Sequence, residues 1–261
     1  MPEIHMKPDT LWKEVDRFEQ APLKQPVFLN SVPKSGSHLL RNIIRMFVAN
    51  EQHYTKQFIQ YGNLSEHAHA IDARKPMLSW GHLFFSDASV IETAQARKIL
   101  LVRDPYDWVL ARARFFVSSE FRGNVEHLRS GSLSVDDLLS IMIFGLPNSA
   151  PPMEDIFTLN AVAWLGSAIH LVRYEELVGV LKKLESDESA QYFSTLLEAC
   201  GIEKPQDWLE RVKIGSAREH SATARERLNL PDMKFPDQLP EKHRALVNYA
   251  APGLRAMLGY S

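Results

Sequence analysis

Short apolar runs alternate with longer amphipathic stretches along the first two thirds of the chain. The runs are rich in branched residues and have the length of strands buried on both faces. They lie at residues 27–32, 77–80, 98–102 and 168–172. The pattern therefore predicts a buried sheet. Residues 62–66 and 229–239 carry neither pattern and are expected to be irregular.

Helices are predicted after the first and third runs. Apolar residues recur at helical spacing over 38–49, and Pro105 stands where the first residue of a helix at 106–116 is expected. Strand, tight turn and helix in alternation are typical of a parallel sheet with crossover helices. We therefore predict one α/β domain over 1–261, with three layers, a mostly parallel central sheet and a helical part from 178 to 261.

Composition and charge exclude several classes of protein. Apolar residues make 45% of the chain and charged residues 24%, which argues against disorder and against a disulfide scaffold. Thirty Lys and Arg against 32 Asp and Glu give a net charge of −2, so nothing global favours nucleic acid or an anionic membrane as a partner. Cys200 is the single cysteine, and no apolar run approaches the ~18 residues of a membrane span. We expect a cytoplasmic protein whose anion binding is local.

The segment 32–38 joins a predicted buried strand to a predicted helix. Free backbone N–H groups and the positive end of a helix dipole meet at such a junction and attract anions. Lys34 adds a mobile charge, and Gly36 permits close approach of a ligand to the backbone. The Walker A pattern is absent because the lysine precedes the glycine, so an ordinary nucleotide triphosphatase is not expected. Taken alone, the segment is also consistent with a plain Ser- and Gly-rich turn.

Three motifs at predicted strand ends resemble one family. Pro33-Lys-Ser-Gly-Ser37 is similar to the 5′-phosphosulfate loop of sulfotransferases that use 3′-phosphoadenosine 5′-phosphosulfate (PAPS). Leu101-Val-Arg-Asp-Pro-Tyr-Asp107 resembles the 3′-phosphate motif of that family, and Val172-Arg-Tyr-Glu-Glu-Leu177 resembles a third family motif. The resemblance covers residues 27–177 well and implies a single α/β domain, with PAPS as co-substrate, 3′-phosphoadenosine 5′-phosphate (PAP) as product and no metal.

The resemblance implies a role for each matching residue. The 5′-phosphosulfate would be held by Lys34, Ser35, Gly36, Ser37 and His38. Lys34 would also be catalytic, because its charge stabilises the oxygen that leaves as the sulfur–oxygen bond breaks. Arg103 would bind the 3′-phosphate with its fork of N–H donors, and Tyr174 would line the adenine site.

His82 follows the second predicted strand, close to where the family carries a catalytic histidine. A neutral imidazole can take a proton from an acceptor hydroxyl as that hydroxyl attacks sulfur. The resemblance therefore predicts His82 as the general base, although a lone histidine at a strand end is more often structural.

The sequence departs from the family at two positions of the site. Trp80 stands where the family has a lysine two residues before its histidine, and Ala111 stands where a serine binds the 3′-phosphate. An alanine methyl group donates no hydrogen bond. Arg112 or Arg114 are possible substitutes for that serine. We interpret the neighbouring Asp104 as a helix cap without a catalytic role.

A basic, glycine-containing loop near the C-terminus closes over the 3′-phosphate in the family. The candidate here runs from Arg211 to Arg218, and it would bind the nucleotide through Lys213, Gly215, Ser216 and Arg218, with Arg225 and Arg227 further on. The family pattern is not complete in this segment, and a charged helix surface explains it equally well.

His67 and His69 form a His-x-His pair near His53, but no further ligand stands at metal spacing. We expect segments 51–72 and 117–158 to shape the acceptor pocket, because loops between fixed motifs commonly carry specificity.

Sequence analysis therefore favours a PAPS-dependent sulfotransferase. It would transfer a sulfuryl group to a hydroxyl, or less readily an amine, of a small molecule or glycan. The oligomeric state cannot be inferred. Two alternatives stay open, which are a P-loop kinase for a small molecule and a non-catalytic nucleotide-binding relative of sulfotransferases.

Overall fold

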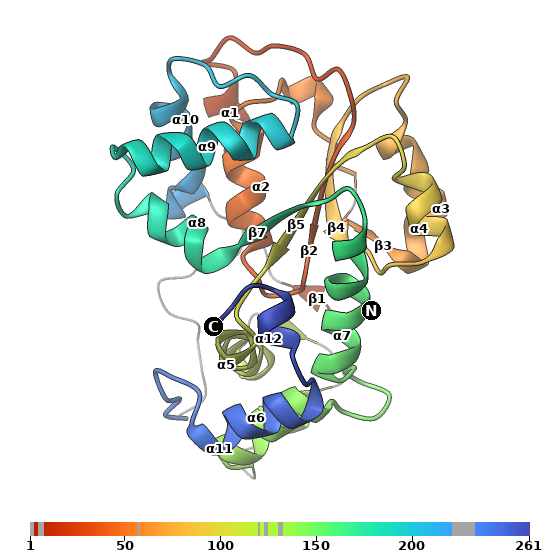
Figure 1. The fold of residues 1–261 in the computed structure, drawn as a ribbon, viewed down its shortest axis with the longest axis vertical. Helices are drawn as coiled ribbons and strands as arrows, with labels where there is room; N and C mark the ends of the chain where they lie inside the picture. Colours follow the sequence, from red (N-terminus) through yellow and green to blue (C-terminus); the bar gives the residue numbers. More distant parts are fainter. Residues whose placement is uncertain are drawn as a thin grey trace.

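The structure is a computed structural model that describes residues 3–4, 8–56, 58–119, 121–122, 125–129, 133–220 and 233–261. Its centre is a five-stranded sheet in the order β3, β4, β2, β5, β7, in which all neighbouring strands are parallel (Figure 1). The strands are β2 (Val27–Ser31), β3 (Ile59–Gln60), β4 (Leu78–His82), β5 (Arg97–Val102) and β7 (His170–Arg173). The predicted single α/β domain with a parallel central sheet is confirmed, and its four predicted strands are all present.

The helices cover both faces of this sheet (Figure 1). In chain order they are α1 (Trp12–Val15), α2 (Ser37–Arg45), α3 (Leu64–His67), α4 (Asp87–Glu92), α5 (Pro105–Val117), α6 (Val135–Phe144), α7 (Met153–Asn160), α8 (Tyr174–Leu181), α9 (Asp187–Ala199), α10 (Trp208–Ser216), α11 (Glu241–Ala250) and α12 (Leu254–Met257). Strands β1 (Glu3–Ile4) and β6 (Phe121–Arg122) form a separate antiparallel pair.

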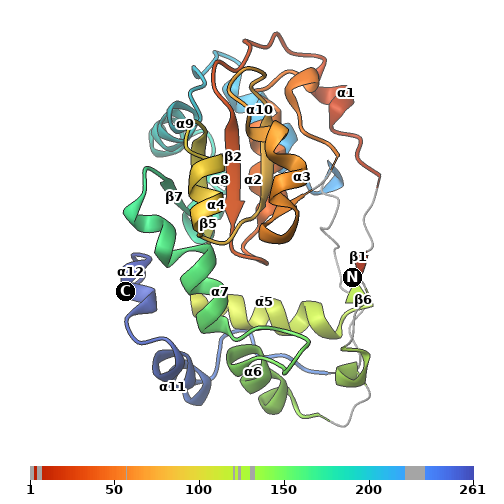
Figure 2. The ribbon, with the colours of Figure 1, turned by 90° about the vertical axis from the view of Figure 1, so that its right-hand side faces the viewer.

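Alternate residues of the central strands enter two different cores. Val27 and Leu29 of β2 pack in a core with α2, α8 and α9, whereas Phe28 packs in a second core with α5, α6 and α7. A strand that is buried on both faces needs apolar residues at successive positions, and this explains why the strands could be recognised as continuous apolar runs. Figure 2 shows α5 crossing below the carboxyl ends of the strands.

Helix boundaries differ from the predictions in two places. Helix α2 ends at Arg45, so that Phe47 and Val48 leave the helix and enter the core. Residues 62–66, predicted to be irregular, are helical instead, and Leu64 is buried. The physical reason is local capping, because Asn63 Oδ1 accepts a hydrogen bond from the backbone N–H of Gln60 at 2.7 Å.

Helices dominate the described residues after 178, as predicted. Within the described ranges, no helix combines the length and the apolar character that crossing a membrane requires.

Candidate functional site

Strand register brings the predicted strand ends to one edge of the sheet. Ser31 pairs with Leu101, and Val102 pairs with Arg173, so the chain segments that follow β2, β5 and β7 begin side by side. Strand β4 ends at His82 beside β2. The loop at 32–37, His82, Arg103 and Tyr174 therefore share the carboxyl edge, which is where parallel α/β sheets bind ligands.

The loop after β2 is held in an uncommon backbone conformation. Gly36 has a φ of 94° and Lys34 a φ of 67°. A Cβ atom on Gly36 would lie 2.5 Å from the ring of Tyr174, so only glycine fits at this position. Trp108 fixes the loop from below, because its Nε1–H donates to the carbonyl oxygen of Pro33 at 2.5 Å. Gly36 is also the N-cap of α2, which leaves the first amides of that helix without a side-chain cap.

Three buried polar atoms at this edge have no hydrogen-bond partner among the described residues. They are Ser35 Oγ, His38 Nδ1 and Arg103 Nε. An unpartnered buried polar atom costs free energy, and such atoms in native structures call for an explanation such as a missing ligand. Hydroxyl and guanidinium groups beside an open helix N-terminus fit an anion of the phosphate type.

The two cations of the site lie on aromatic rings instead of carboxylates. Lys34 Nζ lies 2.9 Å from the ring centroid of Phe115, and the Arg103 guanidinium lies 4.7 Å from the ring of Tyr174. Neither cation forms an ion pair within the part of the chain that the structure describes. Burial lowers the pKa of Lys34 to about 7. The Arg103 charge is therefore available to an anionic ligand, and Lys34 can take up a proton when such a ligand binds.

His82 is oriented by the end of β2. Its Nδ1 lies 2.7 Å from the carbonyl oxygen of Ser31, and a carbonyl oxygen can only accept a hydrogen bond. Nδ1 therefore carries the proton, which leaves the lone pair on Nε2. Burial and the charge of Lys34 lower the pKa of His82 to about 4, so the imidazole is neutral at pH 7. This is the protonation state that a general base requires.

A cation that sequence analysis missed lies beside Trp80. The Arg41 guanidinium stands 4.5 Å from the Trp80 ring, and the ring of His38 contacts the same tryptophan at 4.9 Å. Phe58 connects this group to the base, with its ring 5.4 Å from Trp80 and 4.7 Å from His82. Arg41 could have been recognised from its spacing, because it lies three residues after His38 on the same face of α2.

Both arginines near Ala111 are bound to backbone carbonyl oxygens of neighbouring segments. Arg112 is buried and donates to the carbonyl oxygens of Met142 and Pro151 at 2.9 and 2.8 Å. Arg114 donates to the carbonyl oxygen of Pro236 at 2.8 Å. Both guanidinium groups thus tie α5 to neighbouring segments. The interpretation of Asp104 as a cap is confirmed, because its carboxylate accepts from the Tyr106 N–H at 2.9 Å.

The C-terminal candidate segment is largely helical, as the alternative of a charged helix surface predicts. Lys213 lies on α10 and forms an exposed ion pair with Glu185 at 2.9 Å. Gly215 packs against α2, because an added Cβ would lie 2.8 Å from the backbone oxygen of Asn42. Ser216 Oγ donates within the helix, and Arg218 lies on an exposed 3-10 turn. The described contacts of these four residues are with α2, with Glu185 and within α10. Arg225 and Arg227 lie outside the described residues.

Two of the three histidines of segment 51–72 contact Tyr54. Tyr54 Oη and His67 Nδ1 are 2.5 Å apart, and the ring of His69 lies 5.4 Å from that of Tyr54. His53 Nε2 lies 2.8 Å from the Val48 carbonyl oxygen. Among the described residues, no group of three possible ligands is arranged to hold a metal ion.

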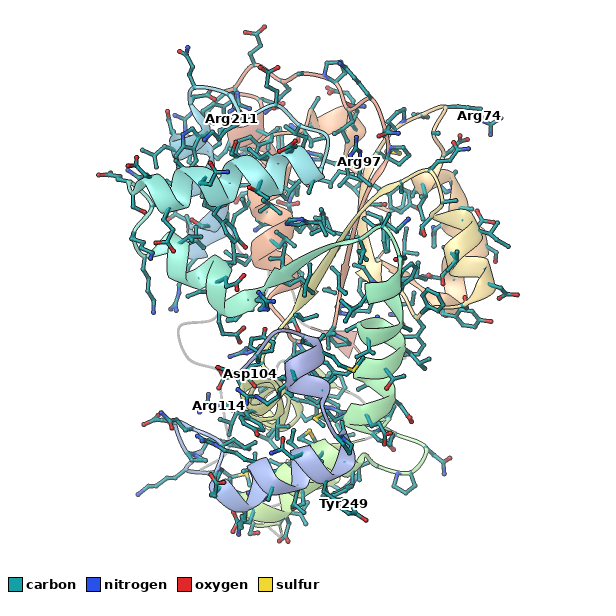
Figure 3. The ribbon with its side chains drawn as sticks, in the orientation of Figure 1. Arg74, Arg97, Asp104, Arg114, Arg211 and Tyr249 are labelled. Atoms are coloured by element: carbon teal, nitrogen blue, oxygen red, sulfur yellow. The ribbon has the colours of Figure 1, made fainter. Side chains whose placement is uncertain are left out.

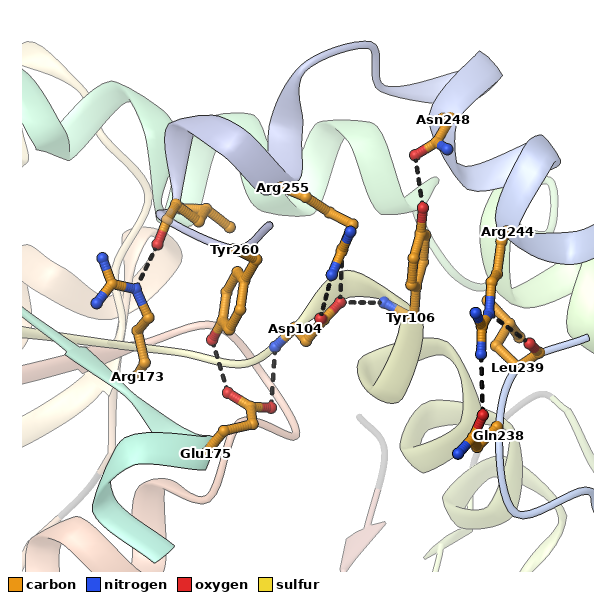
Figure 4. Close-up of polar contacts among 11 residues, drawn as sticks. Asp104, Tyr106, Arg173, Glu175, Gln238, Leu239, Arg244, Asn248, Arg255 and Tyr260 are labelled. Atoms are coloured by element: carbon orange, nitrogen blue, oxygen red, sulfur yellow. Dashed lines mark hydrogen bonds and ion pairs between the residues drawn. The ribbon is translucent and has the colours of Figure 1, made fainter. Parts of the chain in front are cut away.

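The C-terminus supplies further residues that sequence analysis missed. Figure 3 shows Asp104 between α5 and α12, and Figure 4 shows its carboxylate bound by Arg255. Tyr260 donates to Glu175, which lies next to Tyr174. No sequence pattern indicates these contacts, because Arg255 and Asp104 are separated by 151 residues.

Comparisons with known proteins support the fold and leave the activity open. No family model and no curated protein matches the sequence. Among solved structures, the fold is similar to that of the mouse sulfotransferase SULT7A1 complexed with PAP, with a TM-score of 0.60 and 14% identity. The alignment covers 96% of this chain and 93% of the mouse chain. The chain thus shares the fold of a sulfotransferase over nearly its whole length.

Proposed function

We propose that this protein is a sulfotransferase that uses PAPS as the sulfuryl donor. The observation that carries the proposal is the set of unpartnered buried polar atoms, Ser35 Oγ, His38 Nδ1 and Arg103 Nε, beside the uncapped N-terminus of α2. An anion with several negative charges would satisfy these atoms together. The shared fold with a sulfotransferase whose structure contains PAP supports the same conclusion.

The residues of this edge divide into two anion sites in the proposal. Lys34 and the loop Ser35–His38 bind the 5′-phosphosulfate, and Arg103 binds the 3′-phosphate. Tyr174 lines the adenine site from its place between Gly36 and Arg103, because its ring lies next to both. We leave Lys213, Gly215, Ser216 and Arg218 out of this site, because their described contacts lie elsewhere.

His82 and Lys34 carry the chemistry in this mechanism. PAPS supplies the sulfuryl group. His82 Nε2 accepts the proton of the acceptor hydroxyl while the acceptor oxygen forms its bond to sulfur. Lys34 and the amides of the loop stabilise the charge that develops on the phosphate oxygen as its bond to sulfur breaks, so PAP leaves. The acceptor of the proposal is a hydroxyl, or less readily an amine, of a small molecule or glycan.

Trp80 and Ala111 favour a second candidate, a nucleotide-binding relative without transferase activity. Both positions lack the polar group that the family carries there. A single measurement separates the two candidates, because only a transferase moves labelled sulfate from PAPS to an acceptor.

The test has two parts. Calorimetry with PAP and with ATP measures nucleotide preference, and we expect PAP to bind more tightly. Single-turnover transfer from labelled PAPS to a panel of phenols and alcohols measures activity, and we expect His82→Ala to lower the rate by about 10²- to 10⁴-fold while PAP affinity is kept.

His170→Ala is the matched control. His170 is the first residue of β7 and lies at the end of the sheet away from the carboxyl ends of the strands, so this variant should leave the rate unchanged. Tight ATP binding without PAP binding would contradict the proposal and favour a kinase. An undiminished rate in His82→Ala would contradict the assignment of the base.

A further inference from the structure

The last residues of the chain are bound to the strand ends that form the nucleotide site. Arg255 Nε and Nη2 donate to the two carboxylate oxygens of Asp104 at 3.1 and 2.9 Å (Figure 4). Tyr260 Oη donates to Glu175 Oε2 at 2.7 Å, and Glu175 Oε1 accepts from the Asp104 backbone N–H at 3.1 Å. The two carboxylates thus connect the C-terminus to the segments that follow β5 and β7.

These carboxylates lie next to the residues that the proposal assigns to the nucleotide. Asp104 follows Arg103 in the chain, and Glu175 follows Tyr174. The guanidinium of Arg103 lies on the ring of Tyr174, so the two neighbouring segments are also in contact through these side chains. A shift of either segment would move the proposed phosphate ligand.

Charge gives Arg255 a second effect on the site. An uncompensated carboxylate on Asp104, the residue after Arg103, would repel a phosphate that binds to Arg103. Arg255 neutralises Asp104 through two charge-assisted hydrogen bonds, and both side chains are partly buried, with exposures of 22% and 15%. Solvent screens a partly buried pair less than an exposed one, so the neutralisation affects a nearby anion.

The C-terminal residues fit closely against β7. Arg173 Nε donates to the Leu258 carbonyl oxygen at 2.7 Å. Gly259 has a φ of 79°, and an added Cβ there would overlap the Arg173 guanidinium, so the segment is closely held against β7. This packing fixes where Tyr260 meets Glu175.

We propose that Arg255 and Tyr260 are positioning residues that make the site selective for nucleotides with a 3′-phosphate. They act through Asp104 and Glu175, which hold the backbone beside Arg103, and Arg255 also removes the negative charge that would oppose the phosphate. The inference rests on the proposed function, because that proposal assigns the 3′-phosphate to Arg103.

The experiment compares two nucleotides that differ only in the 3′-phosphate. Dissociation constants for PAPS and for adenosine 5′-phosphosulfate are measured by calorimetry, without acceptor. We expect Arg255→Gln to weaken PAPS about tenfold, which is the effect of about one charge-assisted contact, and to leave adenosine 5′-phosphosulfate unchanged. Tyr260→Phe should have a smaller effect of the same kind.

Three further variants make the test specific. Arg255→Lys keeps the charge and should recover most of the PAPS affinity. Asp104→Asn combined with Arg255→Gln removes the uncompensated carboxylate and keeps a good helix N-cap. This double variant should also recover most of the PAPS affinity. Lys242→Gln is the matched control, because it breaks an exposed ion pair with Asp136 between α11 and α6, and both affinities should stay unchanged.

The outcomes separate this inference from the proposed function. An equal loss of affinity for both nucleotides in Arg255→Gln would overturn the inference, because it would indicate a general structural role. Unchanged PAPS affinity in Arg255→Gln and Tyr260→Phe would also overturn it, while leaving the proposed function intact. A wild-type protein that binds neither nucleotide would overturn the proposed function itself.

Discussion

Lys34 connects the electrostatics of the site to a measurable pH dependence. Burial lowers the pKa of its ammonium group to about 7 in the free protein, whereas a bound phosphosulfate or phosphate favours the charged form. Above pH 7 the free lysine is mostly neutral and must take up a proton when the anion binds. Affinity for PAP therefore falls as pH rises, by at most about tenfold per pH unit.

Calorimetry with PAP between pH 7.5 and 9.5 measures this slope, in a range where the phosphates of PAP no longer titrate because their second pKa lies near 6. Lys34→Arg keeps a charge that does not titrate in this range and should flatten the profile. A flat profile in the wild-type protein would show that Lys34 stays charged without a ligand.

At the scale of single residues, strand ends predict which candidate residues lie together, but they do not predict every charge beside them. Lys34, His82 and Arg103 follow apolar runs, so strand ends alone brought them together. The spacing of Arg41 places it on the face of α2 that carries His38, but its contact with Trp80 depends on how α2 packs against the sheet. Arg255 was missed because its partner is fixed only by the complete fold.

Gly36 joins β2 to α2 and allows a prediction at the scale of elements. Gly36→Ala places a Cβ 2.5 Å from the Tyr174 ring at a φ of 94°, which alanine rarely adopts. We expect a loss of about 1–3 kcal/mol in the free energy of unfolding, together with weaker PAP binding, because the loop and the N-terminus of α2 must shift.

Gly179→Ala is the matched control for Gly36→Ala. Gly179 lies inside α8, and nothing stands within 4 Å of an added Cβ. Alanine should stabilise that helix by about 0.5–1 kcal/mol and leave PAP affinity unchanged. Urea unfolding and calorimetry measure both variants. Equal stability of Gly36→Ala and wild type would contradict the strain at the loop.

The strands that could be predicted differ from those that could not in where their sequence pattern comes from. Strands buried on both faces show as apolar runs whatever their partners, so β2, β4, β5 and β7 were predicted. Strand β3 has only two residues and exists through its pairing with β4. The segment 211–218 was consistent with a loop or with a charged helix surface. Gly215 lies in α10, and its lack of a side chain allows α10 to pack closely against α2.

The whole molecule is organised so that its ligand site depends on distant parts of the chain. Helices α2 and α8 pack in one core and α5 in the other, and their N-termini meet at the same sheet edge. The C-terminal residues then connect the ends of β5 and β7. An unfolded chain has no such site, so a nucleotide that binds here stabilises only the folded state.

This linkage predicts a large and cooperative thermal shift. At a PAP concentration about 1,000 times its dissociation constant, the folded state gains about 4.1 kcal/mol. For a single domain of this size, such a gain raises the midpoint of unfolding by roughly 8–16 °C. Scanning calorimetry should show one transition that moves as a whole, with a smaller shift in Arg255→Gln at the same PAP concentration. Two transitions, of which PAP moves only one, would mean that the cores on the two faces of the sheet unfold separately. Because the site depends on both cores, it would then be lost when the less stable core unfolds.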